Sequence, residues 1–99
     1  MIIVTGAVTA RANSFEALLE ASLDHVARSR LEPGCISHAV HVDCENPLRL
    51  VFFEEWADRD ALRAHFKQAG SLEFMESVRQ LAASSAALKI YKAVIATRS

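Results

Sequence analysis

Side chains that could carry acid–base chemistry gather within residues 50–66, LVFFEEWADRDALRAHF. Side chains alternate between the two faces of an extended strand, so Glu54 shares a face with Phe52 and Trp56. A helix is expected next, and its apolar spacing directs His65 toward the sheet. An imidazole, a carboxylate and an indole therefore converge at one place. The ordinary pKa of histidine, roughly 6.5, lies near neutral pH, so His65 is the first candidate for a group that accepts a proton.

The sequence contains four histidines, and their positions rank them as candidate bases. His38 follows His65, because it lies on an apolar face of a strand that should pair beside residues 48–56. His25 lies beside the polar face of its helix, and His41 is on the strand face opposite to His38. We expect His25 and His41 to take no part in the site.

Aromatic side chains could complete a binding site around these groups. Flat apolar rings suit an aromatic ligand, and the candidate rings are Phe52, Trp56, Phe66 and Phe74. Glu54 could orient an imidazole or accept a hydrogen bond from a ligand hydroxyl. The same residues also fit an ordinary core, in which an inward histidine is hydrogen-bonded and the rings are simply buried. A catalytic and a structural interpretation both remain open.

Other chemical motifs are missing from the sequence. It has no glycine-rich phosphate loop, no Ser/His/Asp order and no metal-ligand cluster, so we expect neither a metal nor a cofactor. Cys35 and Cys44 lack the CxxC spacing of zinc sites. If 35–43 is a strand, the two sulfurs lie roughly 30 Å apart at about 3.3 Å per residue. A disulfide needs α-carbons within about 7 Å, so the sequence predicts two free thiols.

The elements that position these side chains follow from apolar periodicity and turn residues. Strands are expected at 2–9, 35–43, 48–56 and 88–93. A first helix begins at Asn13 and ends before Pro33-Gly34, a second is capped by Asp58 and runs through Phe66, and Ser71 caps a further helix. The order is β-α-β-β-α-β. It predicts a ferredoxin-like α+β fold with a four-stranded antiparallel sheet.

Length and composition point to one domain spanning residues 1–99. The net charge is −1 and the isoelectric point is near 6.4, which gives no electrostatic case for nucleic acid or an anionic membrane as partner. No apolar run is long enough to span a bilayer. The opening MIIVTGAVTA lacks the basic region of a signal peptide. We therefore expect a cytoplasmic protein.

Residues 50–53 are apolar on both faces of their strand. Phe52 and Phe53 point to opposite faces because successive side chains alternate, whereas the helices of this chain would cover only one face. A second copy of the sheet is the simplest cover for the other face, so a homodimer is predicted. The alternative is that this face is only a mildly apolar surface.

Several short strings in this order resemble the antibiotic biosynthesis monooxygenase family. They are EPGC at 32–35, FEEW at 53–56 and ALRAHF at 61–66, followed by Phe74, and the similarity runs from about Ile2 to Lys92. The resemblance implies a dimeric α+β barrel. For characterised members it also implies oxygenation of electron-rich phenols, quinols or polyketide anthrones without flavin or metal.

Departures from the family pattern narrow this implication. Polyketide-oxidising members share Trp56 but carry an asparagine where Phe52 stands. The haem-degrading branch uses an asparagine on the first strand and a histidine on the last helix, whereas this chain has Gly6 and Ala7 on that strand and no histidine around 76–78. The small quinol-oxidising members are therefore the closer match.

Two functions follow as alternatives. The first is a cofactor-independent monooxygenase that acts on a quinol, polyphenol or polyketide with molecular oxygen, with His65 or His38 as the base. The second is a non-catalytic dimeric barrel that binds a small aromatic ligand or serves stress defence. Oxygen consumption with a panel of hydroquinones would separate the two.

Overall fold

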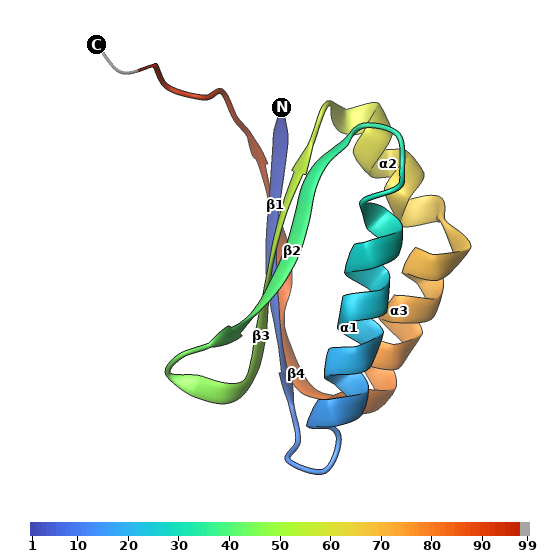
Figure 1. Ribbon diagram of the computed structural model, residues 1–99, viewed down its shortest axis with the longest axis vertical. Helices are drawn as coiled ribbons and strands as arrows, with labels where there is room; N and C mark the ends of the chain where they lie inside the picture. The colour runs from blue at the N-terminus through green and yellow to red at the C-terminus, as the bar shows by residue number, and fades with distance from the viewer. Residues whose placement is uncertain (98–99) are drawn as a thin grey trace.

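The computed structural model describes residues 1–97, which fold into an antiparallel sheet with helices packed on one face (Figure 1). The strands are β1 (Ile2–Ala10), β2 (Cys35–Asp43), β3 (Asn46–Trp56) and β4 (Ala82–Lys92). The helices are α1 (Phe15–Ser29), α2 (Arg59–Lys67) and α3 (Ala69–Leu81). The four strands lie in the order β2-β3-β1-β4. The predicted ferredoxin-like α+β fold is confirmed, with two consecutive helices between β3 and β4.

The C-terminal strand is longer than predicted. β4 begins at Ala82, not at Leu88, because small residues at 82–87 carry too little periodic signal to distinguish strand from helix. These residues pair antiparallel with β1 from Ala10↔Ala82 onward, and this pairing satisfies their backbone groups. α3 in turn begins at Ala69, two positions before Ser71, the predicted cap.

The start of α2 agrees with the prediction, and the start of α1 differs from it. Asp58 caps α2 as expected, because its carboxylate accepts a hydrogen bond of 2.8 Å from the backbone N–H of Ala61. The predicted cap of α1, Asn13, is wrong: Ser14 occupies the N-cap position. The hydroxyl of Ser14 donates a 2.7 Å hydrogen bond to the carbonyl of Leu81. It therefore ties the start of α1 to the end of α3.

The core lies between the sheet and the helices. β1 and β3 pair in a register that sets Val4 opposite Glu54 and Val8 opposite Leu50, so these side chains share the helix-covered face. Val4, Val8, Leu50 and Glu54 are all buried there. The alternation predicted for β3 is thus correct, and it brings a carboxylate into an otherwise apolar layer.

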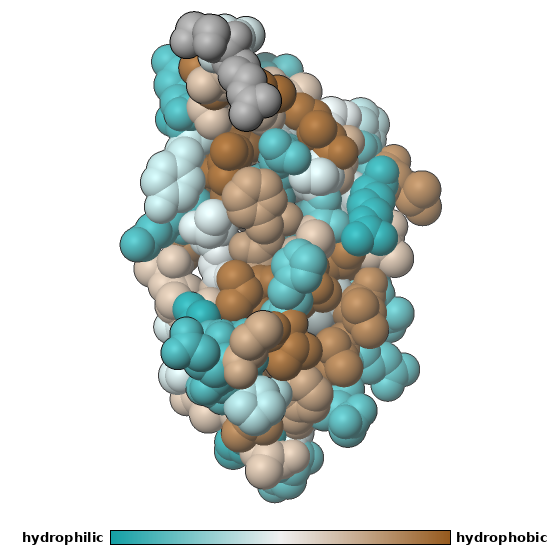
Figure 2. Space-filling view, turned by 60° about the vertical axis from the view of Figure 1, so that its left-hand side comes forward, coloured by the Kyte–Doolittle hydropathy of each residue, from teal (hydrophilic) through white to brown (hydrophobic). Residues whose placement is uncertain are grey.

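The opposite face of the sheet has no cover within the described residues. Phe53 is 40% exposed and Tyr91 is 46% exposed on this face. Figure 2 shows apolar side chains gathered over this side of the molecule.

None of the helices in residues 1–97 combines the length and apolar character that a membrane span requires. Both thiols are free: Cys35 is half-buried and Cys44 is exposed.

Candidate functional site

A cavity of about 220 Å³ opens between the sheet and the three helices. Its walls are mostly apolar, and its polar side chains come from the three helices and from β3 and β4. Five of the residues predicted for the site line this cavity: His65, Phe52, Glu54, Phe66 and Phe74. The other two, His38 and Trp56, are not among its lining residues although both are buried nearby.

Gly6 lines the cavity beside Leu88. It pairs with Phe52 in the sheet, so a side chain at position 6 would point to the helix-covered face. A β-carbon there would lie 2.7 Å from Cδ2 of Leu88, closer than van der Waals contact allows. The absence of a side chain at Gly6 therefore leaves Leu88 in place at the cavity wall.

Glu54 is a buried carboxylate that is held by its strand neighbour. The indole N–H of Trp56 donates a 2.9 Å hydrogen bond to Oε1 of Glu54, which is possible because residues two apart on a strand share a face. Burial raises the pKa of Glu54, and the hydrogen bond from Trp56 offsets part of this rise. Trp56 therefore holds the carboxylate of Glu54, and it is not among the residues that line the cavity.

His65 is held in one orientation by a second carboxylate. Its Nδ1 lies 2.9 Å from Oε1 of Glu32, in the loop between α1 and β2. An ionised carboxylate only accepts hydrogen bonds, so Nδ1 of His65 is the donor to Glu32, and in a neutral imidazole the lone pair is then on Nε2. That Nε2 lies 3.8 Å from Oε1 of Glu54. The sequence analysis missed Glu32, because 33 residues separate it from His65 and only the fold brings them together.

His38 lies deeper and is 1% exposed. Neither of its ring nitrogens has a hydrogen-bond partner among residues 1–97. Its Nε2 comes within 3.4 Å of Oε1 of Glu54, without hydrogen-bond geometry. Burial, with smaller contributions from His65 and Arg30, lowers the pKa of His38 to about 4. His38 is therefore neutral at pH 7.

His25 lies on the inward face of α1, and not beside the polar face of that helix as predicted. It is buried, and its ring stacks on Phe74 at a centroid distance of 4.3 Å and an angle of 8°. Burial lowers the pKa of His25 to about 3, with smaller effects from His38 and His65. The helical spacing does indicate this position. Ser22 lies three residues earlier and is also buried, so His25 continues the inward face of α1.

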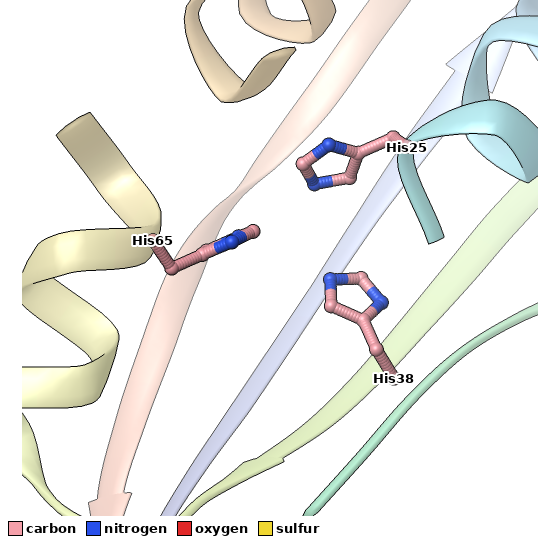
Figure 3. A group of neighbouring side chains, drawn as sticks. All are labelled: His25, His38 and His65. Atoms are coloured by element: carbon pink, nitrogen blue, oxygen red, sulfur yellow. The ribbon is translucent and has the colours of Figure 1, made fainter. Parts of the chain in front are cut away.

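The three buried histidines form one group. One ring nitrogen from each of His25, His38 and His65 lies within 4.8 Å of the others. Figure 3 shows nitrogen atoms of all three rings turned toward a common space, from three separate elements. No sequence motif predicts this group, because its members are far apart in the chain. Such a group can accept or relay a proton, and imidazole is also a common metal ligand.

Comparisons with known proteins agree with this architecture. A model of the antibiotic biosynthesis monooxygenase family matches residues 1–85. An uncharacterized protein of Synechocystis sp. is 36% identical over 91 residues, which are 92% of this chain. The match spans 62% of that relative's own length.

Solved structures share the fold at low identity. A "putative antibiotic biosynthesis monooxygenase" of Deinococcus radiodurans superposes with a TM-score of 0.92 at 22% identity, over 100% of this chain and 98% of that one. A Shewanella oneidensis protein gives 0.89 at 25% identity, over 96% and 92% of the two chains. A Nitrosomonas europaea protein with the same description as the first gives 0.88 at 23% identity, over 96% and 100%. These likenesses establish the fold and leave the activity open.

Proposed function

Because this chain belongs to the antibiotic biosynthesis monooxygenase family, we propose that it oxygenates an electron-rich phenol, with a quinol or a polyphenol as the substrate class. One observation carries the proposal: His65 lines an apolar cavity with its Nδ1–H held by Glu32 and its Nε2 free. A neutral imidazole that is fixed in this way suits a general base. His65 is therefore the proposed base, and His38, the second candidate, is not among the residues that line the cavity.

The size and shape of the cavity favour a single aromatic ring. Its volume of about 220 Å³ is comparable with the ~150 Å³ of an engineered apolar cavity that binds benzene. Phe52 and Phe74 meet edge to face at a centroid distance of 5.6 Å, and Phe66 contributes a further ring. Rings arranged in this way form the flat apolar walls that a phenol requires.

The chemistry needs no external reductant if the substrate is a quinol. A hydroquinone and O₂ give a hydroxyquinone and water, so the quinol supplies all four electrons that O₂ accepts. Nε2 of His65 takes the first phenolic proton, and the resulting phenolate passes an electron to O₂. The carbon radical and superoxide then combine to a peroxide anion, which takes the proton back from His65. The resulting hydroperoxide loses water to give the hydroxyquinone. The role of the protein is to ionise the phenol and to exclude bulk water from the anion.

We also propose that the protein acts as a homodimer. Support comes from the uncovered face of the sheet, where apolar side chains gather (Figure 2) and where Phe53 and Tyr91 are exposed. Val51 and Ala39 extend the same face next to Phe53. A second copy that packs sheet against sheet would bury these apolar side chains.

Oxygen uptake with a panel of hydroquinones tests the proposed function. We expect one O₂ per quinol and no hydrogen peroxide, whereas uncatalysed autoxidation forms peroxide and returns half of the oxygen when catalase is added. His41→Gln is the matched control, since His41 is exposed on the opposite strand face. A protein that binds these quinols without consuming oxygen is a ligand-binding barrel, and the monooxygenase proposal then fails.

A further inference from the structure

We propose that His25, His38 and His65 form a binding site for a divalent first-row transition-metal ion, with Glu54 as the fourth ligand. The three imidazoles come from α1, β2 and α2 and meet inside the protein, with one nitrogen of each within 4.8 Å of the others (Figure 3). All three side chains are buried. Three histidines that converge in a core offer neutral nitrogen ligands directed at one point, which is the arrangement of many zinc and iron sites.

The strongest sign of a missing partner is His38. Both of its nitrogens lack a hydrogen-bond partner within residues 1–97, although the residue is almost completely buried. Buried polar atoms without partners are uncommon and costly in native proteins. A metal ion bound to Nε2 of His38 would satisfy one of these two atoms. Metal binding would therefore explain why His38 is buried between two other imidazoles without a hydrogen bond.

Two carboxylates occupy the positions that a metal site requires. Oε1 of Glu54 lies 3.4 Å from Nε2 of His38 and 3.8 Å from Nε2 of His65, so it borders the same space and can complete a four-ligand set. Glu32 accepts the Nδ1–H of His65 at 2.9 Å. A carboxylate behind a ligating histidine fixes the tautomer and turns the other nitrogen to the ion.

The geometry favours a small transition-metal ion. Zn–N bonds of about 2.0–2.1 Å place tetrahedral ligand atoms roughly 3.4 Å apart. The most distant pair of nitrogens must therefore close by roughly 1.4 Å on binding. Imidazole nitrogen selects Zn²⁺, Co²⁺, Ni²⁺, Cu²⁺ or Fe²⁺, whereas Mg²⁺ and Ca²⁺ prefer oxygen-rich sites.

This metal site goes beyond the proposed oxygenation and does not depend on it. An ion on Nε2 of His65 would occupy the lone pair that the base mechanism uses, so the metal-bound and free-base states exclude each other. Metal binding is measurable without any turnover. Failure of one proposal therefore leaves the other standing.

Co²⁺ titration of protein stripped with chelator is the test. We expect one Co²⁺ per chain, with the intense visible absorption of a four-coordinate ion, and displacement by Zn²⁺. His25→Gln and His38→Gln should each weaken binding at least a hundredfold, whereas His41→Gln should bind as the native chain does. Thermal unfolding gives a second readout: Zn²⁺ should raise the Tm of the native chain and of His41→Gln, but not that of His25→Gln.

The opposite results would overturn the site. Weak or substoichiometric Co²⁺ binding by the native chain excludes it. Equal affinity in all three variants would assign the binding to surface groups. If a histidine variant fails to fold, Glu54→Gln takes its place, and a Co²⁺ spectrum unchanged from the native one would remove Glu54 from the ligand set.

Discussion

The Nδ1 of His65 lies 2.9 Å from Oε1 of Glu32, and this single contact fixes which nitrogen of the imidazole is free. Glu32 comes from the loop after α1, whereas His65 comes from α2, whose start is held by the Asp58 cap. The proton on Nδ1 is set by the loop, and the direction of Nε2 is set by the helix. The contact therefore joins two separate parts of the fold into one functional unit.

Glu32→Gln should slow turnover without weakening substrate binding. A neutral amide can still accept from Nδ1–H, but it gives less support to the imidazolium that forms when His65 takes a proton. We expect kcat to fall about ten- to a hundredfold with KM nearly unchanged. Steady-state kinetics with hydroquinone measure this split. A rise in KM alone would show that Glu32 shapes the cavity and does not orient the base.

Trp56→Phe should show how much the hydrogen bond from the indole N–H stabilises the buried carboxylate of Glu54. The change leaves a buried carboxylate without its 2.9 Å hydrogen bond, so the free energy of unfolding at neutral pH should fall by about 1–3 kcal/mol. The penalty should shrink at acidic pH, where Glu54 is protonated. Urea unfolding measures both values.

Phe52→Leu is the matched control for this change, since it removes aromatic volume from the same strand face without a polar partner. Its penalty should not vary with pH. If the two variants show the same pH dependence, the indole–carboxylate hydrogen bond does not govern the ionisation of Glu54.

Stability of the metal-free protein should fall in acid because two histidines are buried neutral. The pKa is about 4 for His38 and about 3 for His25, against 6.5 for a free histidine. Below pH 6.5 the unfolded chain binds more protons than the folded one, so the free energy of unfolding falls as pH drops toward 4 and then 3. The slope reaches up to about 1.4 kcal/mol per pH unit for each histidine.

Glu54 acts in the opposite sense, because its raised pKa favours the folded state when it is protonated. Urea unfolding between about pH 4.5 and 7.5 measures the slope, which should be smaller in His38→Gln than in His41→Gln. Equal slopes in these two variants would contradict the assignment of the acid sensitivity to His38.

Phe53→Glu should separate the proposed dimer. A carboxylate on the uncovered sheet face would be buried without a partner in the interface, which is strongly unfavourable. Sedimentation should show a dimer for the native chain at micromolar concentration and a monomer for this variant. Leu23→Glu, an equivalent change at an exposed position of α1, should remain dimeric. A monomeric native chain would refute the dimer itself.

Much of the architecture was predictable because it rests on local signals. The alternation in β3 correctly placed Phe52, Glu54 and Trp56 on one face, and the Asp58 cap fixed the start of α2. The apolar pattern of residues 50–53 also predicted a sheet with an uncovered second face. Each of these features depends on neighbours in the sequence, so the period of two or the cap chemistry suffices to find it.

The rest of the site depends on contacts that local patterns do not encode. Glu32 and His65 meet across the fold, and the hydrogen bond from Trp56 to Glu54 forms inside the core. The burial of His25 depends on how α1 packs against α3, and its polar neighbours in the sequence gave no sign of it.

Isotope labelling can show whether His65 initiates the oxygenation of a bound phenol. Hydroquinone is oxidised under ¹⁸O₂, and the product is reduced at once to the trihydroxybenzene so that its oxygens cannot exchange with water. We predict one ¹⁸O atom per product with the native chain and with His41→Gln, and a rate lowered about a hundredfold or more in folded His65→Gln. Product without ¹⁸O, or labelling by His65→Gln at the native rate, would contradict this account.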